Sequence, residues 1–169
     1  MTTFTPPTPY LDTQRLVLEP LRIFHAAEMT RVLADNDLYE FTGGEPPSFE
    51  QTMRRYTLMY AGSRHETEQW HNWILRSKAS NKAIGHLQAT VTAFNTAFAW
   101  TIGQASQRQG FAKEASQSAA DWLHEHGVQK LDAWIHAEHE ASQRVAQSLD
   151  MVRTVDVDED GEERWSTGD

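Results

Sequence analysis

The residues with the clearest chemistry lie between positions 107 and 113, where a predicted strand leads into a predicted helix. The first backbone amides of a helix have no intrahelical carbonyl to bind, and they point along the positive end of the helix dipole. Such a turn binds anions. Gly110 lacks a side chain, so a phosphate can approach the main chain closely. The segment therefore predicts a phosphate site, and its consecutive amides suit a diphosphate better than a single carboxylate.

The side chains around Gly110 favour the same chemistry. Arg108 and Lys113 add positive charge, and the small Ala112 lets a ligand lie close to the first helical turn. An ordinary strand-to-helix loop with a glycine fits the spacing equally well, so the spacing alone leaves both interpretations open. Two other phosphate motifs, a glycine-rich loop ending in Gly-Lys-Ser/Thr and a three-glycine dinucleotide fingerprint, do not occur.

The order of residues in this segment resembles the GNAT acetyltransferase superfamily. Gln107, Gly110 and Ala112 match the three defining positions of that family's pyrophosphate loop, Gln/Arg-x-x-Gly-x-Gly/Ala. The family's continuation Gly-x-Ala-x-Glu-Ala is present at 110–115. The order of elements agrees with this family from residue 15 to residue 165, so the resemblance covers nearly the whole chain.

Within that family, the sequence is similar to the branch that contains the ribosomal-protein N-terminal acetyltransferases. The branch pattern Asn-x-x-Ser-x-x-Val is matched at Ser142 and Val145, with His139 in place of the asparagine. Residues 99–102 stand where the branch has Gly-Tyr-Trp-Leu, and Asp-Met at 150–151 replaces the usual Gly-Phe. We interpret these departures as drift within the family rather than as loss of cofactor binding.

The resemblance implies that acetyl-CoA lies in a V-shaped gap between two parallel strands, at 97–102 and 131–135. Unpaired main-chain groups of splayed strands can hydrogen-bond the pantetheine amides, and a backbone N–H near residues 100–102 can polarise the thioester carbonyl. The cofactor-binding residues implied in this way are Trp100, Thr101, Ile102, Gln107, Arg108, Gln109, Gly110, Phe111, Ala112, Lys113, His139 and Ser142.

The sequence favours direct transfer of an acyl group to an amine. It contains no cysteine and no Gly-x-Ser-x-Gly elbow, so a covalent acyl-enzyme is disfavoured. The acceptor amine must be neutral to attack, which at pH 7 costs roughly 4–5 kcal/mol for a lysine side chain and about 1 kcal/mol for an α-amine. A peptide or protein N-terminus therefore demands less of the enzyme. A small-molecule amine, such as a polyamine or an aminoglycoside, stays open as the acceptor.

Four residues are candidates for proton transfer. Glu40, His71 and His86 could each supply a base that acts through water, although a strand histidine is more often just hydrogen-bonded within its sheet. By resemblance, Ser142 lies near the departing sulfur and donates a proton to it. The plainer interpretation of Ser142 is a polar residue in the first turn of a helix.

Alternation and helical spacing predict the elements that position these residues. Three consecutive strands form an antiparallel meander, and the strand, helix and strand after it form a crossover that favours a parallel pair. The predicted fold class is therefore α/β in the broad sense. It is an α+β arrangement with one mixed parallel and antiparallel sheet and helices on both of its faces. In the strand 83–92, Leu87 is expected on one face and Ile84 on the other. The predicted strands are 15–19, 70–76, 83–92, 97–102 and 131–135, and the predicted helices are 23–34, one capped by Ser48 and extending to Tyr60, 111–126 and 141–149.

Length and charge describe the rest of the chain. Residues 1–169 are expected to form one domain, with an extended arm at 1–10 and a hairpin at 153–166. The net charge is −9, and six acidic residues lie within positions 156–163. This balance argues against a nucleic-acid partner. The acidic hairpin is most simply solvated, although it could attract a cationic acceptor. No secretory signal and no long apolar run occur, so no membrane association and a cytoplasmic location are expected.

The eight histidines do not predict a metal site. His124 and His126 point in different directions on a helix, and His136 and His139 have no evident third ligand. The oligomeric state stays open, with a homodimer as one form. The competing function is an acyl-CoA-binding module without turnover, either a sensor or a partner-binding subunit, and His139 is one reason to keep it.

Overall fold

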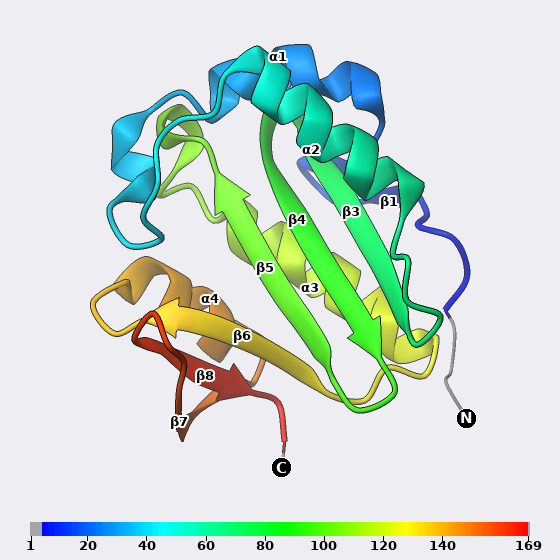
Figure 1. The fold of residues 1–169 in the computed structure, drawn as a ribbon, viewed down its shortest axis with the longest axis vertical. Helices are drawn as coiled ribbons and strands as arrows, with labels where there is room; N and C mark the ends of the chain where they lie inside the picture. Colours follow the sequence, from blue (N-terminus) through cyan, green and yellow to red (C-terminus); the bar gives the residue numbers. More distant parts are fainter. Residues whose placement is uncertain (1–4, 169) are drawn as a thin grey trace.

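The structure is a computed structural model, and it describes residues 5–168. In this part of the chain a mixed sheet of eight strands organises the fold, in the order β1-β2-β3-β4-β5-β6-β8-β7 (Figure 1). All neighbouring pairs are antiparallel except β5 and β6, which are parallel. The strands are β1 (Leu11–Asp12), β2 (Leu16–Pro20), β3 (Glu68–Ser77), β4 (Ala83–Thr92), β5 (Thr96–Ile102), β6 (Leu131–His136), β7 (Val152–Val157) and β8 (Glu162–Ser166).

Helices cover both faces of the sheet. Figure 1 shows α1 (Ala26–Val32) and α2 (Phe49–Ala61) on one face and α3 (Phe111–Glu125) behind the other. The crossover from β5 to β6 runs through α3, and α4 (Glu140–Ser148) follows β6. Short 3-10 turns lie at Ile23–His25, Asn36–Tyr39 and Gln104–Ser106. The mixed sheet, the meander, the parallel pair and the two helical layers are all confirmed.

The larger core lies between the sheet and α3. Leu87 and Leu131 pack there against Leu123 of α3, and Ala115 and Ala119 let this helix approach the strands because their side chains are small. Apolar faces of this kind hold the layers together. A smaller core between the sheet and α1 and α2 includes Met29, Tyr56 and Ile74.

One predicted side-chain direction is wrong. Ile84 belongs to the same buried cluster as Leu87, although simple alternation places them on opposite faces. The reason is a bulge: Leu75 pairs with Gly85 and Arg76 with Ala83, which leaves Ile84 as an extra residue. An extra residue of this kind shifts the alternation of the strand.

The two ends of the described chain can be compared with the predicted arm and the predicted hairpin. Residues 1–4 of the expected arm lie outside the described residues, and the end of the arm continues into β1, a short strand that the alternation did not predict. Pro9 in this arm accepts a hydrogen bond from the indole of Trp73 at 2.8 Å. The expected C-terminal hairpin is present as β7 and β8, and its tight turn contains Gly161 in a left-handed conformation.

The two halves of the sheet meet at a very short junction. β5 and β6 pair only at Thr96 with Leu131 and at Ala97 with Asp132. Beyond these pairs β5 stays on β4 as far as Ile102, whereas β6 stays on β8 as far as His136. The two strands therefore diverge, as Figure 1 shows.

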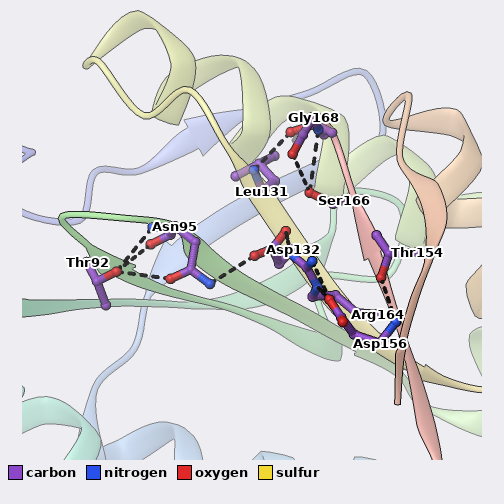
Figure 2. A network of polar contacts seen from close by, with 10 residues as sticks. Thr92, Asn95, Leu131, Asp132, Thr154, Asp156, Arg164, Ser166 and Gly168 are labelled. Carbon is purple, nitrogen blue, oxygen red and sulfur yellow. Dashed lines mark hydrogen bonds and ion pairs between the residues drawn. The ribbon is translucent and has the colours of Figure 1, made fainter. Parts of the chain in front are cut away.

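A polar network holds the two halves of the sheet together at the end where β5 and β6 are paired (Figure 2). Asp132 is 1% exposed and accepts a hydrogen bond from Asn95 of the β4–β5 turn at 2.9 Å. Its other carboxylate oxygen lies 3.6 Å from the guanidinium of Arg164 on β8, which also pairs with Asp156 of β7. The network links a turn in one half of the sheet to two strands in the other, so it fixes the point from which the halves diverge.

Candidate active site

The loop after β5 presents a row of free main-chain donors. Within the described residues, the N–H groups from 108 to 113 donate no hydrogen bond, and the first bond of α3 runs from Glu114 N–H to Gly110 O at 3.1 Å. The amide of Gln107 is not part of this row, because it donates to Gln104 O. The Gln107 side chain donates to Ile102 O at 3.0 Å, so Gln107 braces the loop with both donors.

The backbone of this loop has an unusual conformation at two positions. Gly110 caps α3 with φ of +80°, in the left-handed region. A Cβ at this position would meet only the Nη2 atom of Arg15, at 3.5 Å, so conformation rather than space requires the glycine here. Arg108 also has a positive φ, of 60°, which is strained for a residue with a side chain.

A residue that the sequence interpretation missed, Arg15, holds this loop in place. Its Nε atom lies 2.7 Å from Glu114, its Nη1 atom donates to Gln109 O at 2.8 Å, and its guanidinium lies 4.4 Å from the centre of the Phe111 ring. Glu114 also accepts from the backbone N–H of Arg15 and from the hydroxyl of Thr13. Burial alone would raise the pKa of Glu114, but these hydrogen bonds hold it below its ordinary value. The sequence signal that could have revealed the role of Arg15 is its partner Glu114, which is the glutamate of Gly-x-Ala-x-Glu-Ala at 110–115.

The three long side chains of the loop point to solvent. Arg108, Gln109 and Lys113 are all exposed. The two cations therefore lie at the rim of the row of amides, whereas Arg15, which is 43% exposed, braces the loop from the β1–β2 turn.

Main-chain groups of β5 also face the gap between the diverging strands. Thr96 N–H donates toward β6, to Lys130 O, and Gly103 N–H donates toward β4, to Ile84 O. Because main-chain groups alternate in direction along a strand, those of the residues between them alternate too. The main-chain groups of Phe98, Trp100 and Ile102 point toward β6, and beyond the last β5–β6 pair, Ala97 with Asp132, those of Trp100 and Ile102 face the gap.

This alternation corrects one expectation. Thr101 is paired with His86 of β4, so its N–H points away from the gap and cannot be the oxyanion donor. The side chain of Thr101 instead lines a cleft on the α2 face of the sheet. Trp100 lines the same cleft. Its backbone N–H points toward the gap, as expected for the oxyanion donor.

The cleft has a volume of about 610 Å³ and lies where the two halves of the sheet separate. Its floor on β3 and β4 includes the neutral polar residues Asn72, Gln88 and Thr90, together with the acidic Glu68 and the aromatic Trp70. Arg55 and Met59 of α2 contribute a wall, and β6, β8 and α4 contribute the opposite side. The remaining residues that line it, with side chain or main chain, are Thr42, Ala97, Phe98, Ala99, Asp132, Ala133, Trp134, Ile135, His136, His139, Ser142 and Glu162.

Glu162 is a carboxylate of this cleft with a raised proton affinity. Burial, together with the nearby Asp158 and Asp160, raises its pKa above the ordinary value. It lies on β8 opposite His136 of β6. The sequence interpretation counted Glu162 among the acidic hairpin residues and not as a base, because only the pairing of β8 with β6 brings it to the cleft.

His139 and Ser142 come together at the start of α4. The hydroxyl of Ser142 lies 3.4 Å from Nε2 of His139, and both line the cleft. The ring of Phe41 stacks on His139 at 4.6 Å and also contacts His136 at 5.4 Å. Burial and the nearby His136 lower the pKa of His139, against the opposing effect of Glu40.

Glu40 itself does not reach the cleft. It is exposed at the end of the Asn36–Tyr39 turn, and it is not among the residues that line the cavity. Its neighbour Phe41 makes the contact with α4 instead. We therefore withdraw Glu40 as a base.

His71 is also excluded, because it lies on the opposite face of the sheet. It is fully buried, and its ring nitrogens lie 2.6 Å from the hydroxyl of Thr5 and 2.9 Å from that of Thr8. Its ring contacts Trp73 and Trp122 in the larger core. Burial lowers its pKa to about 4. His71 is thus a satisfied core histidine that fastens the N-terminal arm.

His86 lies beside the cleft without lining it. Burial, aided by the positive charge of Arg55, lowers its pKa to about 4. A base that holds a proton this weakly is a poor acceptor for the proton of an amine at neutral pH.

Two departures from the branch pattern have structural explanations. Asp150 has φ of +59°, the left-handed conformation that a glycine adopts readily at the end of a helix. Met151 is 2% exposed and fills the core where the branch has phenylalanine. Neither residue touches the cleft.

Residues 5–168 contain no group of three histidine or acidic side chains arranged to hold a metal ion. In the same residues, none of the helices combines the length and the apolar character that crossing a membrane requires.

Comparisons with known proteins agree with this geometry. The structure resembles an acetyltransferase of the GNAT family from Bacillus anthracis, with a TM-score of 0.77, 15% identity, and coverage of 94% of this chain and 96% of that one. A Salmonella typhimurium acetyltransferase that modifies the N-terminal serine of a 50S ribosomal subunit protein gives a TM-score of 0.77 at 12% identity, with 94% and 98% covered. A microcin self-immunity acetyltransferase, solved with acetyl-CoA and AMP, gives 0.75 at 10% identity, with 90% and 92% covered. At these identities the likeness shows the fold alone.

Sequence comparison supplies the family. No curated protein matches the chain, but the model of the acetyltransferase (GNAT) domain matches residues 15–152. This match covers most of the chain, including the loop, both diverging strands and α4. The chain therefore belongs to the GNAT acetyltransferase family.

Proposed function

We propose that this protein is an acetyl-CoA-dependent N-acetyltransferase that transfers the acetyl group directly to an amine held in the cleft. The observation that carries the proposal is the row of six unpartnered amides at the start of α3, adjoining the gap-facing groups of β5. A diphosphate needs several convergent donors, and the pantetheine amides need exposed main-chain partners. The residues of this site fit both requirements.

The main chain would hold the cofactor. The amides from Arg108 to Lys113 bind the diphosphate, with Arg15 and Gln107 fixing the loop. The N–H of Trp100 is placed to stabilise negative charge on the thioester oxygen. Acetyl-CoA supplies an activated carbonyl, at which the amine nitrogen forms the new C–N bond as the C–S bond breaks.

Two side chains would handle the protons. Glu162 lines the cleft with a raised pKa, so it is suited to accept the proton that the amine loses. The hydroxyl of Ser142, within reach of His139, can donate a proton to the departing thiolate. The protons balance through solvent, because Glu162 releases to water the proton that it takes from the amine, and Ser142 takes back from water the proton that it gives to sulfur.

An α-amine is the acceptor we favour. Its deprotonation is cheaper than that of a lysine by roughly 3–4 kcal/mol at pH 7, and the branch resemblance at Ser142 and Val145 points to enzymes that modify chain N-termini. A small-molecule amine is the next class to test.

The decisive experiment is a CoA-thiol release assay with acetyl-CoA and a panel of amines, including short peptides with free N-termini, polyamines and aminoglycosides. Thiol release that needs both an amine and an intact Gly110 supports the enzyme. Tight binding of acetyl-CoA with no release on any amine supports the alternative, an acyl-CoA sensor or partner-binding module. The observation that keeps this alternative open is His139, which replaces the asparagine of the branch pattern. Its ring stacks on Phe41 in the lining of the cleft.

A further inference from the structure

A second, much smaller cavity lies beside the cleft, between α2 and β4. Its volume is about 20 Å³, and Thr52, Tyr56 and His86 contribute to its lining. Arg55 and Met59 line both this cavity and the cleft. The small cavity therefore borders the wall that α2 gives to the cleft.

Two buried polar atoms in the lining have no partner. Within the described chain, neither the hydroxyl oxygen of Tyr56 nor the Nδ1 atom of His86 has a hydrogen bond. Tyr56 is 2% exposed, so solvent at the surface does not reach its hydroxyl. Native proteins satisfy most buried polar atoms, and a bound water often does so. Two such atoms in one lining point to a shared ligand.

The size and chemistry of the cavity suit one water molecule. A polar cavity of roughly 10–15 Å³ is large enough for a water that finds two or more partners. Thr52 offers a third group, because its hydroxyl donates to Ser48 O at 3.0 Å and keeps free lone pairs. Burial and the charge of Arg55 keep His86 neutral, since they lower its pKa to about 4. The cationic Arg55 also lines the cavity, but the two unpartnered atoms and the Thr52 hydroxyl belong to neutral groups, which suits a neutral molecule.

We propose that this cavity is a site for one ordered water molecule, which hydrogen-bonds Tyr56 of α2 and His86 of β4 and so fixes α2 against the sheet. Arg55 precedes Tyr56 on the same helix and lines the cleft, so the water sets the position of the cleft wall. His86 is then a positioning residue rather than a base.

A high-resolution crystal structure of the full chain tests the site directly. We expect density for one water within hydrogen-bonding distance of both Tyr56 Oη and His86 Nδ1. An empty cavity, or direct contact between the two side chains, would overturn the proposal.

The sign of a stability change gives a second test. If a water bridges the two atoms, Tyr56→Phe breaks a hydrogen bond and raises the unfolding equilibrium constant roughly two- to tenfold. If the hydroxyl is unsatisfied, removing it leaves that constant unchanged or lowers it, and the proposal fails. Tyr39→Phe is the control, because Tyr39 donates to Leu33 O at 2.9 Å and does not line the cavity.

Replacement of His86 separates the hydrogen bond from packing. Asparagine can place a polar atom close to the position of Nδ1, whereas leucine cannot. We expect His86→Asn to stay nearer the wild type in stability than His86→Leu. Equal losses in the two variants would contradict a bound water.

A kinetic readout tests the positioning role, and this part rests on the proposed function. Tyr56→Phe should raise KM for the acceptor amine several-fold and leave KM for acetyl-CoA unchanged. An unchanged acceptor KM in an active enzyme rejects the positioning role. If no amine is acetylated at all, the proposed function fails, while the crystallographic and stability tests still decide the water site.

Discussion

The two ends of the candidate site are built from different parts of the chain. Under the proposed function, main-chain N–H groups of one loop and one strand bind the cofactor at one end, and side chains such as Arg15 only hold that backbone in shape. At the acceptor end, side chains from α2, β3, β4, β6, β8 and α4 converge on the cleft. A site made of main-chain groups depends on the conformation of the backbone, whereas a site made of side chains depends on which amino acids are present. Mutations at the two ends should therefore fail in different ways.

The largest effect is expected from Gly110→Glu. Its left-handed backbone would be strained by a side chain, and a carboxylate would repel the diphosphate, so the affinity for CoA should fall roughly a thousandfold, about 4 kcal/mol. Isothermal calorimetry measures the loss. The matched control is Gly161→Glu, which introduces the same strain at φ of +82° in the distant hairpin. Equal losses of affinity in both variants would refute a backbone site at the loop.

Acid pH should weaken the fold through the face of the sheet opposite the cleft. The folded protein resists protonation of His71, whose pKa falls from 6.5 to about 4, whereas the unfolded chain accepts the proton. Stability is then full above pH 6.5 and declines as the pH falls toward 4, by about 3 kcal/mol from this residue.

Denaturant unfolding at a series of pH values measures this decline, and His71→Gln should remove the part due to His71, while the part due to His86, whose pKa is also lowered to about 4, stays. An unaltered slope in that variant would mean that His71 is not a buried core residue.

A specific loss of turnover is expected from Glu162→Gln. Removing the base should lower kcat roughly a hundredfold, with CoA affinity unchanged. Because the pKa of Glu162 is raised, the wild-type rate should climb with pH through a value above that of an ordinary glutamate, and the variant should lose this limb. Glu159→Gln is the control, an exposed change of the same charge in the same hairpin. Equal losses of activity in both variants would mean that the total negative charge of the hairpin supports turnover, and not Glu162 as a base.

A smaller effect on cofactor affinity is expected from Arg15→Ala. Loss of its bonds to Gln109 and Glu114 should loosen the loop and weaken CoA binding roughly tenfold, about 1.4 kcal/mol. Arg15→Lys should not restore the affinity, since lysine lacks the planar fork that makes both contacts. Arg144→Ala, which breaks an exposed pair with Glu140, should leave binding intact.

The smallest effect is expected from changing Arg108 and Lys113 together to alanine. Both are exposed, and exposed charges contribute little, so CoA affinity should fall only about threefold, and less at high salt. Pantetheine, which lacks the phosphates, should bind the variant and the wild type alike. A loss as large as that of Arg15→Ala would place these cations against the phosphates.

The contrast between the two ends also explains what could be predicted from the sequence. The loop at Gly110 was identifiable because a glycine and a helix start are local in the chain. The strands, the meander and the crossover followed from alternation and spacing in the same way. Glu162 was missed as a base because its position depends on which strand β8 pairs with. The prediction of His71 as a base was wrong because neighbouring residues of a strand point to opposite faces of the sheet. Spacing alone did not show which of these faces carries the cleft.

The short junction between β5 and β6 has an evolutionary consequence. The main-chain pairing between the halves is only two residue pairs long, whereas β6, α4 and β8 share the larger core with α3, so it is substitutions confined to their cleft-facing side chains that leave the packing behind the loop in place. Under the proposed function, selection can then change which amine is accepted while the residues that bind acetyl-CoA are inherited unchanged. Such modularity is one route by which proteins that share this shape at 10–22% identity could diverge in acceptor.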